Sequence, residues 1–389
     1  MKILMTLETP FPPDKRVENE IEVLVSAGYK VHLICPESRK KLETQFSSFQ
    51  VHYILPSKFI RKSSVGALRF PFYVNYWKKE IRKLLEVYNF DIIHIHDLPL
   101  IKPIYELKNH FSFKIVLDLH ENWPGLLSVS PYTQSVLGKL LCSIKEWENY
   151  ERRYLKKADK IIVVVEEARD RILSLDSDMP EIYVVSNTLN LKDKLPQKSK
   201  RTADSGKRIF VYEGGITWHR GLQNILKALS MIGDARGKVE LWIIGDGSYL
   251  KTLKKLCKSL ALEENVKFFG WQPQEKIFDL LSKADIALIP HIKSEHTDTT
   301  IPHKLFHYMY VELPVIASNC NPIERIIRET NCGIVYQSDN PGSLSNILRE
   351  IIHNPASLDP YKKSRRWIER KYNWDNDSLQ LVNLYRSIS

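Results

Sequence analysis

The chain has 389 residues, of which 43% are hydrophobic and 10% aromatic, so it is long enough for two globular domains and too apolar to be disordered. Its net charge of +11 favours an anionic partner, without choosing between nucleic acid, phosphorylated metabolites and a membrane surface. Five scattered cysteines with no CxxC pair argue against a disulfide framework and a thiolate zinc site, and favour a cytoplasmic protein. We expect neither a signal peptide nor a membrane span, because no sufficiently long apolar run is present.

Strands alternate with helices in the first half of the chain. The first strand, KILMTLE, is followed by a helix that turns Val17, Ile21 and Leu24 inward. Helices are also predicted near 101–107 and across 136–158, and further strands at 29–35, 91–99, 113–120, 160–165 and 182–187. Apolar strands separated by helices predict a parallel sheet that is covered on both faces.

A second series of strands follows a polar segment. Residues 191–207 carry many charges without apolar periodicity, which predicts a linker. Strands are predicted after it at 208–213, 239–244, 266–270, 285–290, 314–318 and 332–337. We therefore predict an α/β protein of two Rossmann-like, doubly wound domains facing across a cleft, at residues 1–190 and 208–360, with a helical segment at 361–389 packing across the join.

Between Lys58 and Leu85, basic residues alternate with aromatic ones. This composition suits nucleic acid or the surface of an anionic membrane. It also suits a solvated helix face over a core-facing aromatic stripe. The chain has no recognisable nucleic-acid module, so we expect no nucleic-acid partner.

Ligands of such sheets bind at the carboxyl ends of the strands, so the turns there are the candidate sites. In YEGGITWHRG, Gly214 and Gly215 allow a close approach of the backbone, and Arg220 adds a positive charge, a combination that suits phosphate. Gly-Gly after a strand is also common in plain tight turns.

Two further turns of the second half carry glycine after a strand. IIGDGS places Gly245 there, but it is not the dinucleotide-binding fingerprint. FFGWQPQEK places Gly270 and Trp271 where exposed backbone groups could meet a nucleobase, or where the tryptophan simply packs in a loop.

The stretch HTDTTIPHKLFHYM predicts a polar loop that contains Thr300 and then a helix with Pro302 in its first turn. The exposed amides of His303 and Lys304 at that helix start, with the lysine charge, predict an anion site. His303 and His307 are four residues apart and could instead bind a metal with help from Asp298 or His296, an alternative that we consider weaker.

In the first half, His120 follows a strand, and we expect its side chain to face the cleft. Asp14 and Arg16 lie at the mouth of the first helix and could reach an acceptor, although an aspartate in that position is often only a helix cap.

The ordered motifs of nearly the whole chain resemble those of the retaining glycosyltransferases of family 4, which have the GT-B architecture. The resemblance rests on PPDKRVENEIEVLVSAGYKV, DIIHIHDLP, LDLHENWP, YEGGITWHRGL, IIGDGS, VKFFGW, ADIALIP and PHKLFHYM. It implies that a nucleoside diphosphate sugar binds in the second domain and an acceptor in the first, with no metal or other cofactor.

The resemblance also implies roles for individual residues. Arg220 would bind the diphosphate and stabilise the leaving group, and the amides after Pro302 would hold phosphates or sugar hydroxyls. His120 would lie near the transferred sugar, and the backbone of Gly270 and Trp271 would meet the base.

The chain departs from the family at two positions. The family commonly has two glutamates eight residues apart around the donor helix, and here these positions hold Thr299 and His307. A histidine can hydrogen-bond a ribose hydroxyl, whereas a threonine supplies no carboxylate. The departure keeps two alternatives open, a GT-B subunit that binds a nucleotide sugar without transferring it and a nucleotide-sugar epimerase.

For an active enzyme, we expect a hexosyl or N-acetylhexosaminyl donor, a UDP-sugar first and a GDP-sugar next. The expected acceptor is a glycan or a lipid-linked intermediate of surface-polysaccharide assembly. The segment from Lys58 to Leu85 would then bind an anionic membrane, so that the protein is cytoplasmic and peripheral at the inner face of the cell membrane.

Overall fold

The computed structural model describes residues 1–38, 47–193 and 206–388. The chain forms two compact units. Unit 1 comprises Met1–Asn187 and Asn376–Ser389, and unit 2 comprises Thr188–Asp375. The C-terminal segment is therefore divided between the units after Asp375. Most of the predicted linker, residues 194–205, lies outside the described residues.

Unit 1 is built on a seven-stranded parallel sheet with the strand order β3-β2-β1-β4-β5-β6-β7. Its strands are β1 (Lys2–Thr6), β2 (Lys30–Pro36), β3 (Gln50–Ile54), β4 (Ile92–His96), β5 (Lys114–Leu119), β6 (Lys160–Val163) and β7 (Ile182–Val184). The predicted alternation is confirmed, but β3 was not predicted. It is an edge strand in which only Ile54 is buried, so its sequence lacks the apolar run of the central strands.

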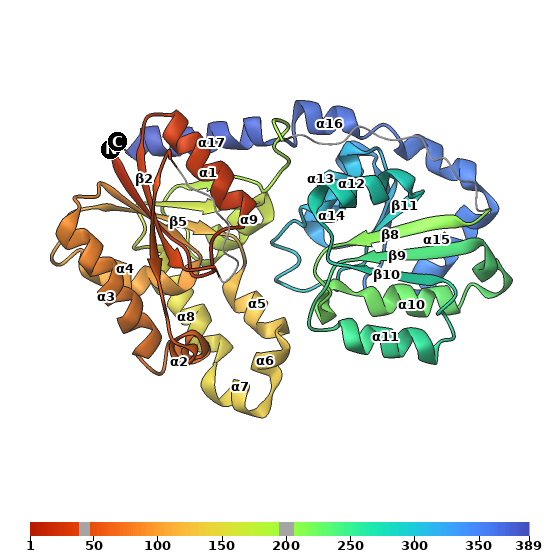
Figure 1. The fold of residues 1–389 in the computed structure, drawn as a ribbon, viewed down its shortest axis with the longest axis horizontal. Helices are drawn as coiled ribbons and strands as arrows, with labels where there is room; N and C mark the ends of the chain where they lie inside the picture. The colour runs from red at the N-terminus through yellow and green to blue at the C-terminus, as the bar shows by residue number, and fades with distance from the viewer. Residues whose placement is uncertain (39–46, 194–205, 389) are drawn as a thin grey trace. The chain divides into compact units, whose positions relative to one another are not determined.

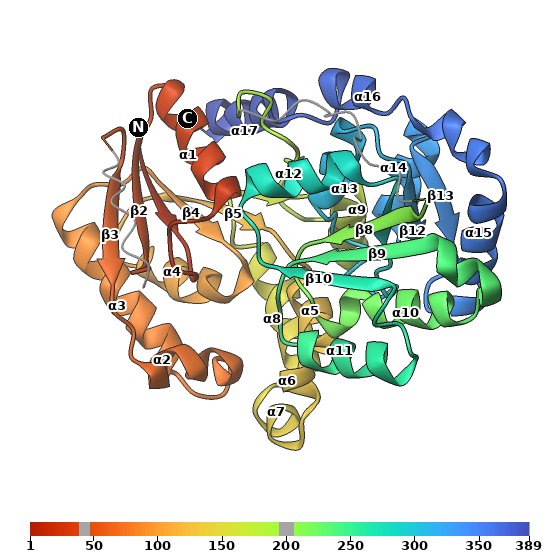
Figure 2. The ribbon, with the colours of Figure 1, turned by 45° about the vertical axis from the view of Figure 1, so that its right-hand side comes forward.

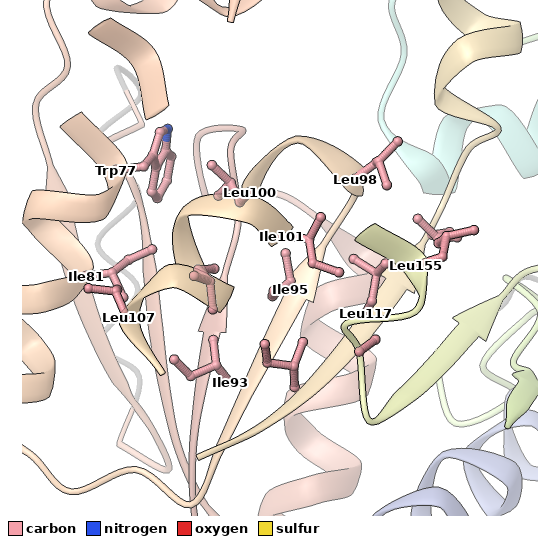
Figure 3. Close-up of a cluster of buried hydrophobic side chains, with 14 of the residues drawn as sticks. Trp77, Ile81, Ile93, Ile95, Leu98, Leu100, Ile101, Leu107, Leu117 and Leu155 are labelled. Carbon is pink, nitrogen blue, oxygen red and sulfur yellow. The ribbon is translucent and has the colours of Figure 1, made fainter. Parts of the chain in front are cut away.

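Helices cover both faces of the unit 1 sheet. Figure 1 shows α1 (Lys15–Ser26) and α17 (Trp374–Ile388) on one side, and α3 (Phe72–Val87) and α4 (Ile101–Leu107) on the other. Side chains of α3, α4 and α8 (Ile144–Leu155) meet those of β4 and β5 in one buried cluster, part of which is drawn in Figure 3. The remaining helices are α2 (Lys58–Ser63), α5 (Trp123–Val129), α6 (Pro131–Gln134), α7 (Val136–Leu141) and α9 (Glu166–Leu175).

The basic and aromatic segment forms α2, a short 3₁₀ turn and α3. Tyr73 and Trp77 of α3 are buried in the core, which supports the interpretation of a core-facing stripe for this helix. Phe59, Phe70 and Phe72 are instead 60%, 45% and 48% exposed, so the aromatic residues at the start of the segment lie on the surface.

Unit 2 repeats the strand order with six parallel strands, β10-β9-β8-β11-β12-β13. These are β8 (Arg208–Glu213), β9 (Val239–Ile244), β10 (Val266–Gly270), β11 (Ile286–Ile289), β12 (Val315–Ser318) and β13 (Gly333–Tyr336). Helices α10 (Leu222–Ser230) and α11 (Leu250–Ser259) lie on one side of the sheet, and α12 (Gln274–Lys283) and α13 (Lys304–Tyr310) on the other (Figure 2). The unit also contains α14 (Asn321–Thr330), α15 (Pro341–His353) and α16 (Arg365–Arg370). The predicted fold class is confirmed.

Two further sequence expectations concern thiols and membrane spans. All five cysteines are unpaired and buried. None of the helices in the described part of the chain combines the length and the hydropathy that crossing a lipid bilayer requires.

Candidate functional site

Glycines at the carboxyl ends of β8 and β9 bring the backbone close to a lysine side chain. Gly214 and Gly245 have φ angles of 117° and 138°, which residues with a side chain rarely adopt. A Cβ atom on Gly245 would lie 2.0 Å from the carbonyl oxygen of Gly214, and one on Gly214 would lie 3.0 Å from Nζ of Lys304. Gly214 therefore leaves the space that Lys304 occupies, and Gly245 allows the two turns to approach each other closely.

Arg220 is held by a neutral histidine. It ends a 3₁₀ turn, Trp218–Arg220, and its Nη1 donates a hydrogen bond of 2.9 Å to Nε2 of His291. Burial, with the charges of Arg220 and Lys304, holds the pKa of His291 well below its usual value. The uncharged ring can therefore accept from the guanidinium and orient it without neutralising it.

Lys304 is a buried amine without an anionic partner in contact. The residue is 7% exposed, and its Nζ hydrogen-bonds to no residue that the structure describes. Nζ lies 3.7 Å from the ring centroid of Tyr212, a cation–π contact. Burial and the nearby charge of Arg220 lower the pKa of Lys304 well below its usual value. The site thus favours an anion that would restore the charge on Lys304.

His307 is paired with a carboxylate that the sequence did not indicate. Its Nδ1 lies 2.5 Å from Oε1 of Glu213, the last residue of β8. Burial alone would raise the pKa of Glu213, but His307 and Lys304 hold it below its usual value, so Glu213 is an anion. An anionic Glu213 accepts the Nδ1 hydrogen, while Nε2 of His307 is buried without a hydrogen-bond partner among the described residues.

The donor helix begins later than the sequence predicts. α13 starts at Lys304 rather than at Pro302 and has seven residues, so its dipole is short. His303 precedes it, with Nε2 3.4 Å from the carbonyl oxygen of Thr188. Burial and His307 lower the pKa of His303 to about 3, so this ring is neutral at physiological pH.

The threonines before α13 satisfy their hydroxyl groups within their own turn. Thr299 donates to the carbonyl oxygen of Glu295 at 2.7 Å, and Thr300 donates to that of His296 at 3.2 Å. Asp298 accepts from Lys293 Nζ and the Asn321 amide, both at 2.8 Å. The carboxylate of Asp298 is therefore already bonded to neighbouring groups, which argues against its joining His303 and His307 at a metal.

The other predicted donor residues follow β8 and β10. Gly215 comes directly after Gly214, and its carbonyl oxygen accepts a hydrogen bond of 2.7 Å from Tyr212. Gly270 ends β10 with a φ angle of 68°, and Trp271 is 70% exposed directly after it.

In unit 1, His120 belongs to a buried network of charged groups. Its Nε2 lies 3.2 Å from Oδ2 of Asp118 and 3.0 Å from Nδ1 of His96, and its amide donates to Asp97 at 3.2 Å. Burial alone would lower the pKa of His120, but Asp118 and Asp97 outweigh it and raise the pKa to about 9. His120 is therefore an imidazolium at neutral pH.

Arg16 points into this network. Its Nη2 donates to both carboxylate oxygens of Asp118 at 3.0 Å, and its Nε lies 2.9 Å from Glu20. Arg16 is 5% exposed, so unit 1 gives no geometric support for its predicted contact with an acceptor. Asp14 caps α1 by accepting from the amide of Val17, which is the alternative that its position suggested.

Among the described residues, the groups with metal-ligand spacing are Glu20, His94, His96 and Asp118, not His303 and His307. The ligand atoms of these four buried residues lie within 4.8 Å of one another. Arg16 already supplies a cation to both of the carboxylates, so the cluster fits a charge-compensated network better than a metal site.

Comparison with known proteins identifies the family. The model described as Glycosyltransferase Family 4 matches residues 15–193, and the model described as Glycosyl transferases group 1 matches residues 193–374. The chain belongs to glycosyltransferase family 4. With its two parallel-sheet units, it is a glycosyltransferase of the GT-B type.

Relatives of this family 4 glycosyltransferase are distant. A glycosyltransferase of Methanocaldococcus jannaschii is 22% identical over 78% of this chain and 77% of its own length. The amylovoran biosynthesis glycosyltransferase AmsK of Erwinia amylovora is 28% identical over 45% of this chain and 43% of its own. Sucrose-phosphate synthase from Thermosynechococcus elongatus has the same fold, with a TM-score of 0.79 at 18% identity, covering 100% of this chain and 99% of that one.

Sequence reasoning missed several residues of the family 4 site, and some of them left a signal. His96 and Asp118 interrupt the apolar strands IIHIH and KIVLDL, and polar groups inside such strands indicate a buried network. Glu213 likewise ends an apolar strand just before Gly214. His291 gave no comparable signal, because it lies in a loop far from Arg220 in sequence.

The raised pKa of His120 gives a testable pH dependence. We expect the ring to titrate near pH 9 in an NMR titration of the whole chain, because Asp118 and Asp97 stabilise the imidazolium. The stability that this charge contributes is fully present below about pH 6.5 and is lost as the pH rises through about 9. The pKa of His120 should fall in the Asp97→Asn variant. The control is Asp91→Asn, which changes an exposed aspartate that directly precedes β4. A wild-type pKa near 6.5 would contradict the network.

Proposed function

We propose that the chain transfers a sugar, with retention of its anomeric configuration, from a nucleoside diphosphate sugar bound in unit 2. The observation that carries the proposal is the pair of basic side chains in the segments that follow β8 and β11. Among the described residues, the guanidinium of Arg220 hydrogen-bonds to neutral His291, and Lys304 is buried without an anion in contact. A diphosphate supplies the negative charge that both side chains lack.

The chemistry of transfer accounts for this arrangement. The bond between the anomeric carbon and the diphosphate oxygen breaks, and negative charge develops on the leaving group. The acceptor oxygen forms the new bond to the anomeric carbon, and its proton ends on the diphosphate. Arg220 and Lys304 would stabilise the departing diphosphate, and they need no reorganisation because the fold already holds them in place.

His307 and Glu213 together suit a ribose hydroxyl. Because Glu213 accepts the Nδ1 hydrogen of His307, Nε2 is the ring nitrogen left to contact a ribose hydroxyl, a contact that a carboxylate makes at this position elsewhere in the family. Thr299 offers no comparable group, since its hydroxyl is bonded within its turn. We therefore propose a replacement for the second family glutamate, by His307, and none for the first.

His120 would act as a charged hydrogen-bond donor near the transferred sugar. An imidazolium with a pKa of about 9 is a poor base, so the proposed role is to bind and orient rather than to remove a proton. A retaining mechanism in which the leaving diphosphate takes the acceptor proton requires no base from the protein.

A UDP-sugar is the first candidate donor and a GDP-sugar the next, carrying a hexosyl or N-acetylhexosaminyl group. Support comes from a structural neighbour, Anabaena HepE, which was solved in complex with UDP-glucose and has a TM-score of 0.71 at 15% identity. Trp271 and Gly270 are the proposed base-side contacts.

The diphosphate site can be tested by binding and activity together. We expect a UDP-, GDP-, ADP- or dTDP-sugar to raise the melting temperature of the wild-type protein. Arg220→Ala should lower the rate of transfer by roughly 10²-fold or more. Lys304→Met should stabilise the ligand-free protein, because it removes a buried amine that has no hydrogen-bond partner among the described residues, and should abolish the ligand-induced shift.

Lys227→Ala, on the exposed side of α10, is the matched control and should behave as wild type. Full transfer activity in Arg220→Ala, or an unchanged ligand shift in Lys304→Met, would refute the assignment. The fold of each variant is checked by its own unfolding curve.

The ribose contact predicts a dependence on the ribose hydroxyls. His307→Ala should bind UDP about tenfold more weakly, but it should bind the analogue that lacks the bonded hydroxyl, either 2′-deoxy- or 3′-deoxy-UDP, nearly as well as the wild type does, because the lost hydrogen bond is absent there already. Glu213→Gln should lose part of the same discrimination, and the double variant should lose little more than His307→Ala. His353→Ala, an exposed histidine, is the control. Equal losses for UDP and its deoxy analogues would show that the two residues are only structural.

We further propose that the segment from Lys58 to Leu85 holds the enzyme on an anionic membrane and that the acceptor is lipid-linked or a glycan of surface-polysaccharide assembly. Phe59 and Phe72 are exposed with ring centroids 5.4 Å apart, and Phe70 lies 6.3 Å from Phe72. Basic residues flank these rings, and each basic residue near such a surface contributes about 1 kcal/mol.

Flotation with phosphatidylglycerol vesicles tests the membrane proposal. The wild-type protein should float with the vesicles at low salt, and neutralising Lys78, Lys79, Arg82 and Lys83 should weaken this. Replacing Phe59, Phe70 and Phe72 by serine should weaken it further by removing exposed apolar surface. Val136→Ser removes a side chain that is 91% exposed elsewhere and is the control. No flotation at low salt, or flotation unaffected by these changes, would remove the proposal.

A further inference from the structure

Unit 1 contains a cavity of about 270 Å³ that none of the predicted catalytic, donor-binding or acceptor-side residues lines, although Arg61, Tyr73 and Trp77 of its walls belong to the segment from Lys58 to Leu85. It lies at the carboxyl ends of β1 and β4, which are neighbours in the sheet. The strand order reverses between these two strands, and ligands of doubly wound sheets bind at such points. Glu8 follows β1 and Asp97 follows β4, so the two carboxyl groups flank the reversal.

The polar side of the cavity is formed by groups with unusual properties. Glu8 accepts a hydrogen bond from the hydroxyl of Tyr73. Burial raises the pKa of Glu8 to about 8 and also raises that of Asp97, so Glu8 is largely protonated at neutral pH and can both donate and accept. Asp97 has φ 67° and ψ 161°, a backbone conformation that is costly for any residue except glycine.

Asp97 also connects the cavity to the proposed catalytic centre. Its Oδ1 accepts the amide hydrogen of His120 at 3.2 Å. The strained residue that lines the cavity therefore fixes the main chain of His120. Strain of this kind persists where the surrounding structure enforces it, and it concentrates at ligand sites.

The remaining walls of the cavity combine aromatic side chains with one positively charged side chain that forms no ion pair among the described residues. Trp77 and Trp123 both line the cavity, and Nε1 of Trp123 is buried without a hydrogen-bond partner among the described residues. Arg61 lines it as well, and its guanidinium forms no ion pair within the described part of the chain. A second cavity of about 150 Å³ shares Arg61, Pro36 and Pro56 with the first and is also lined by Glu37.

These features select a ligand class. A pyranose has C–H faces that pack on aromatic rings and hydroxyl groups that pair with carboxyl groups, which suits the partly buried ring of Trp123 and the carboxyl groups of Glu8 and Asp97. Arg61, between the two cavities, suits a phosphate attached to that sugar. A neutral peptide or an apolar chain would leave both carboxyl groups and the guanidinium without partners.

We propose that this cavity binds the acceptor, as a sugar residue whose hydroxyls contact Glu8 and Asp97 and whose phosphate contacts Arg61. The proposal rests on the proposed transferase function and names the chemistry of its second substrate. The sugar phosphate can come from a polyprenyl pyrophosphate lipid or from a soluble metabolite, which share the chemistry that the cavity recognises.

Binding is tested on the whole chain by isothermal titration and saturation-transfer NMR. The probes are glucose 1-phosphate, galactose 1-phosphate and N-acetylglucosamine 1-phosphate, together with the three free sugars. At least one phosphate should bind the wild-type protein, and Arg61→Gln should weaken it about tenfold, to the level of the free sugar. Glu8→Gln and Asp97→Asn should weaken both forms. Lys62→Gln, an exposed neighbour of Arg61 that lines neither cavity, should change nothing.

The outcomes separate this proposal from that of the donor site. No binding of any probe to a protein that still binds UDP would overturn the acceptor cavity and leave the donor site standing. Equal losses in Arg61→Gln and Lys62→Gln would overturn the phosphate contact. Transfer to a polyprenyl pyrophosphate sugar in nanodiscs but not to the soluble phosphates would identify the lipid as the source, and the reverse would identify the metabolite. Either result supports the cavity, provided that Glu8→Gln reduces transfer.

Discussion

A buried amine without an ion-pair partner in contact, Lys304, is the constraint around which unit 2 is arranged. A buried ammonium without an anion costs several kcal/mol, and proteins usually avoid this by neutralising the group or pairing it. Burial and Arg220 accordingly hold the pKa of Lys304 well below its usual value. Gly214 leaves room for the side chain, the ring of Tyr212 contacts it, and neutral His291 holds Arg220 without removing its charge. These features hold both basic groups in a preformed place, so a diphosphate would gain both ion pairs without reorganising the site.

Unit 1 handles buried charge in the opposite way. Arg16 forms an ion pair with Asp118 within the same unit, and the carboxylates of Asp118 and Asp97 stabilise the positive charge of His120. This part of the site is therefore complete without a ligand and can orient His120 rigidly. The difference fits the proposed division of labour, since the donor brings its own negative charge whereas an acceptor sugar is read mainly through hydrogen bonds.

The sequence predicted the features that follow directly from strand ends. Apolar strands that alternate with helices indicated the doubly wound sheets, because strands have a recognisable apolar pattern. Basic residues in the turns after strands indicated Arg220 and Lys304, because phosphate binding requires positive charge next to exposed backbone amides. The orientation of a side chain leaves no such pattern. Arg16 was read as facing a ligand, but its guanidinium turns inward to Asp118, which is 102 residues away in sequence. The cavity of unit 1 was missed for the same reason, since it combines loops after separate strands with residues of α2, α3 and α5.

The pair of Glu213 and His307 would let a family position change its residue while keeping one of the proposed hydrogen bonds to the ribose. A carboxylate can accept from two adjacent ribose hydroxyls, whereas Nε2 of an imidazole accepts from one. Glu213 accepts from Nδ1 and so leaves Nε2 for the proposed contact, which keeps one hydrogen bond to the ribose and loses the second. With Thr299 bonded inside its own turn, the proposed donor site has fewer anionic groups for substrate hydroxyls than the family pattern supplies. On this proposal, affinity in unit 2 would depend more heavily on the diphosphate, and discrimination between donors would depend more heavily on the base and on the transferred sugar itself.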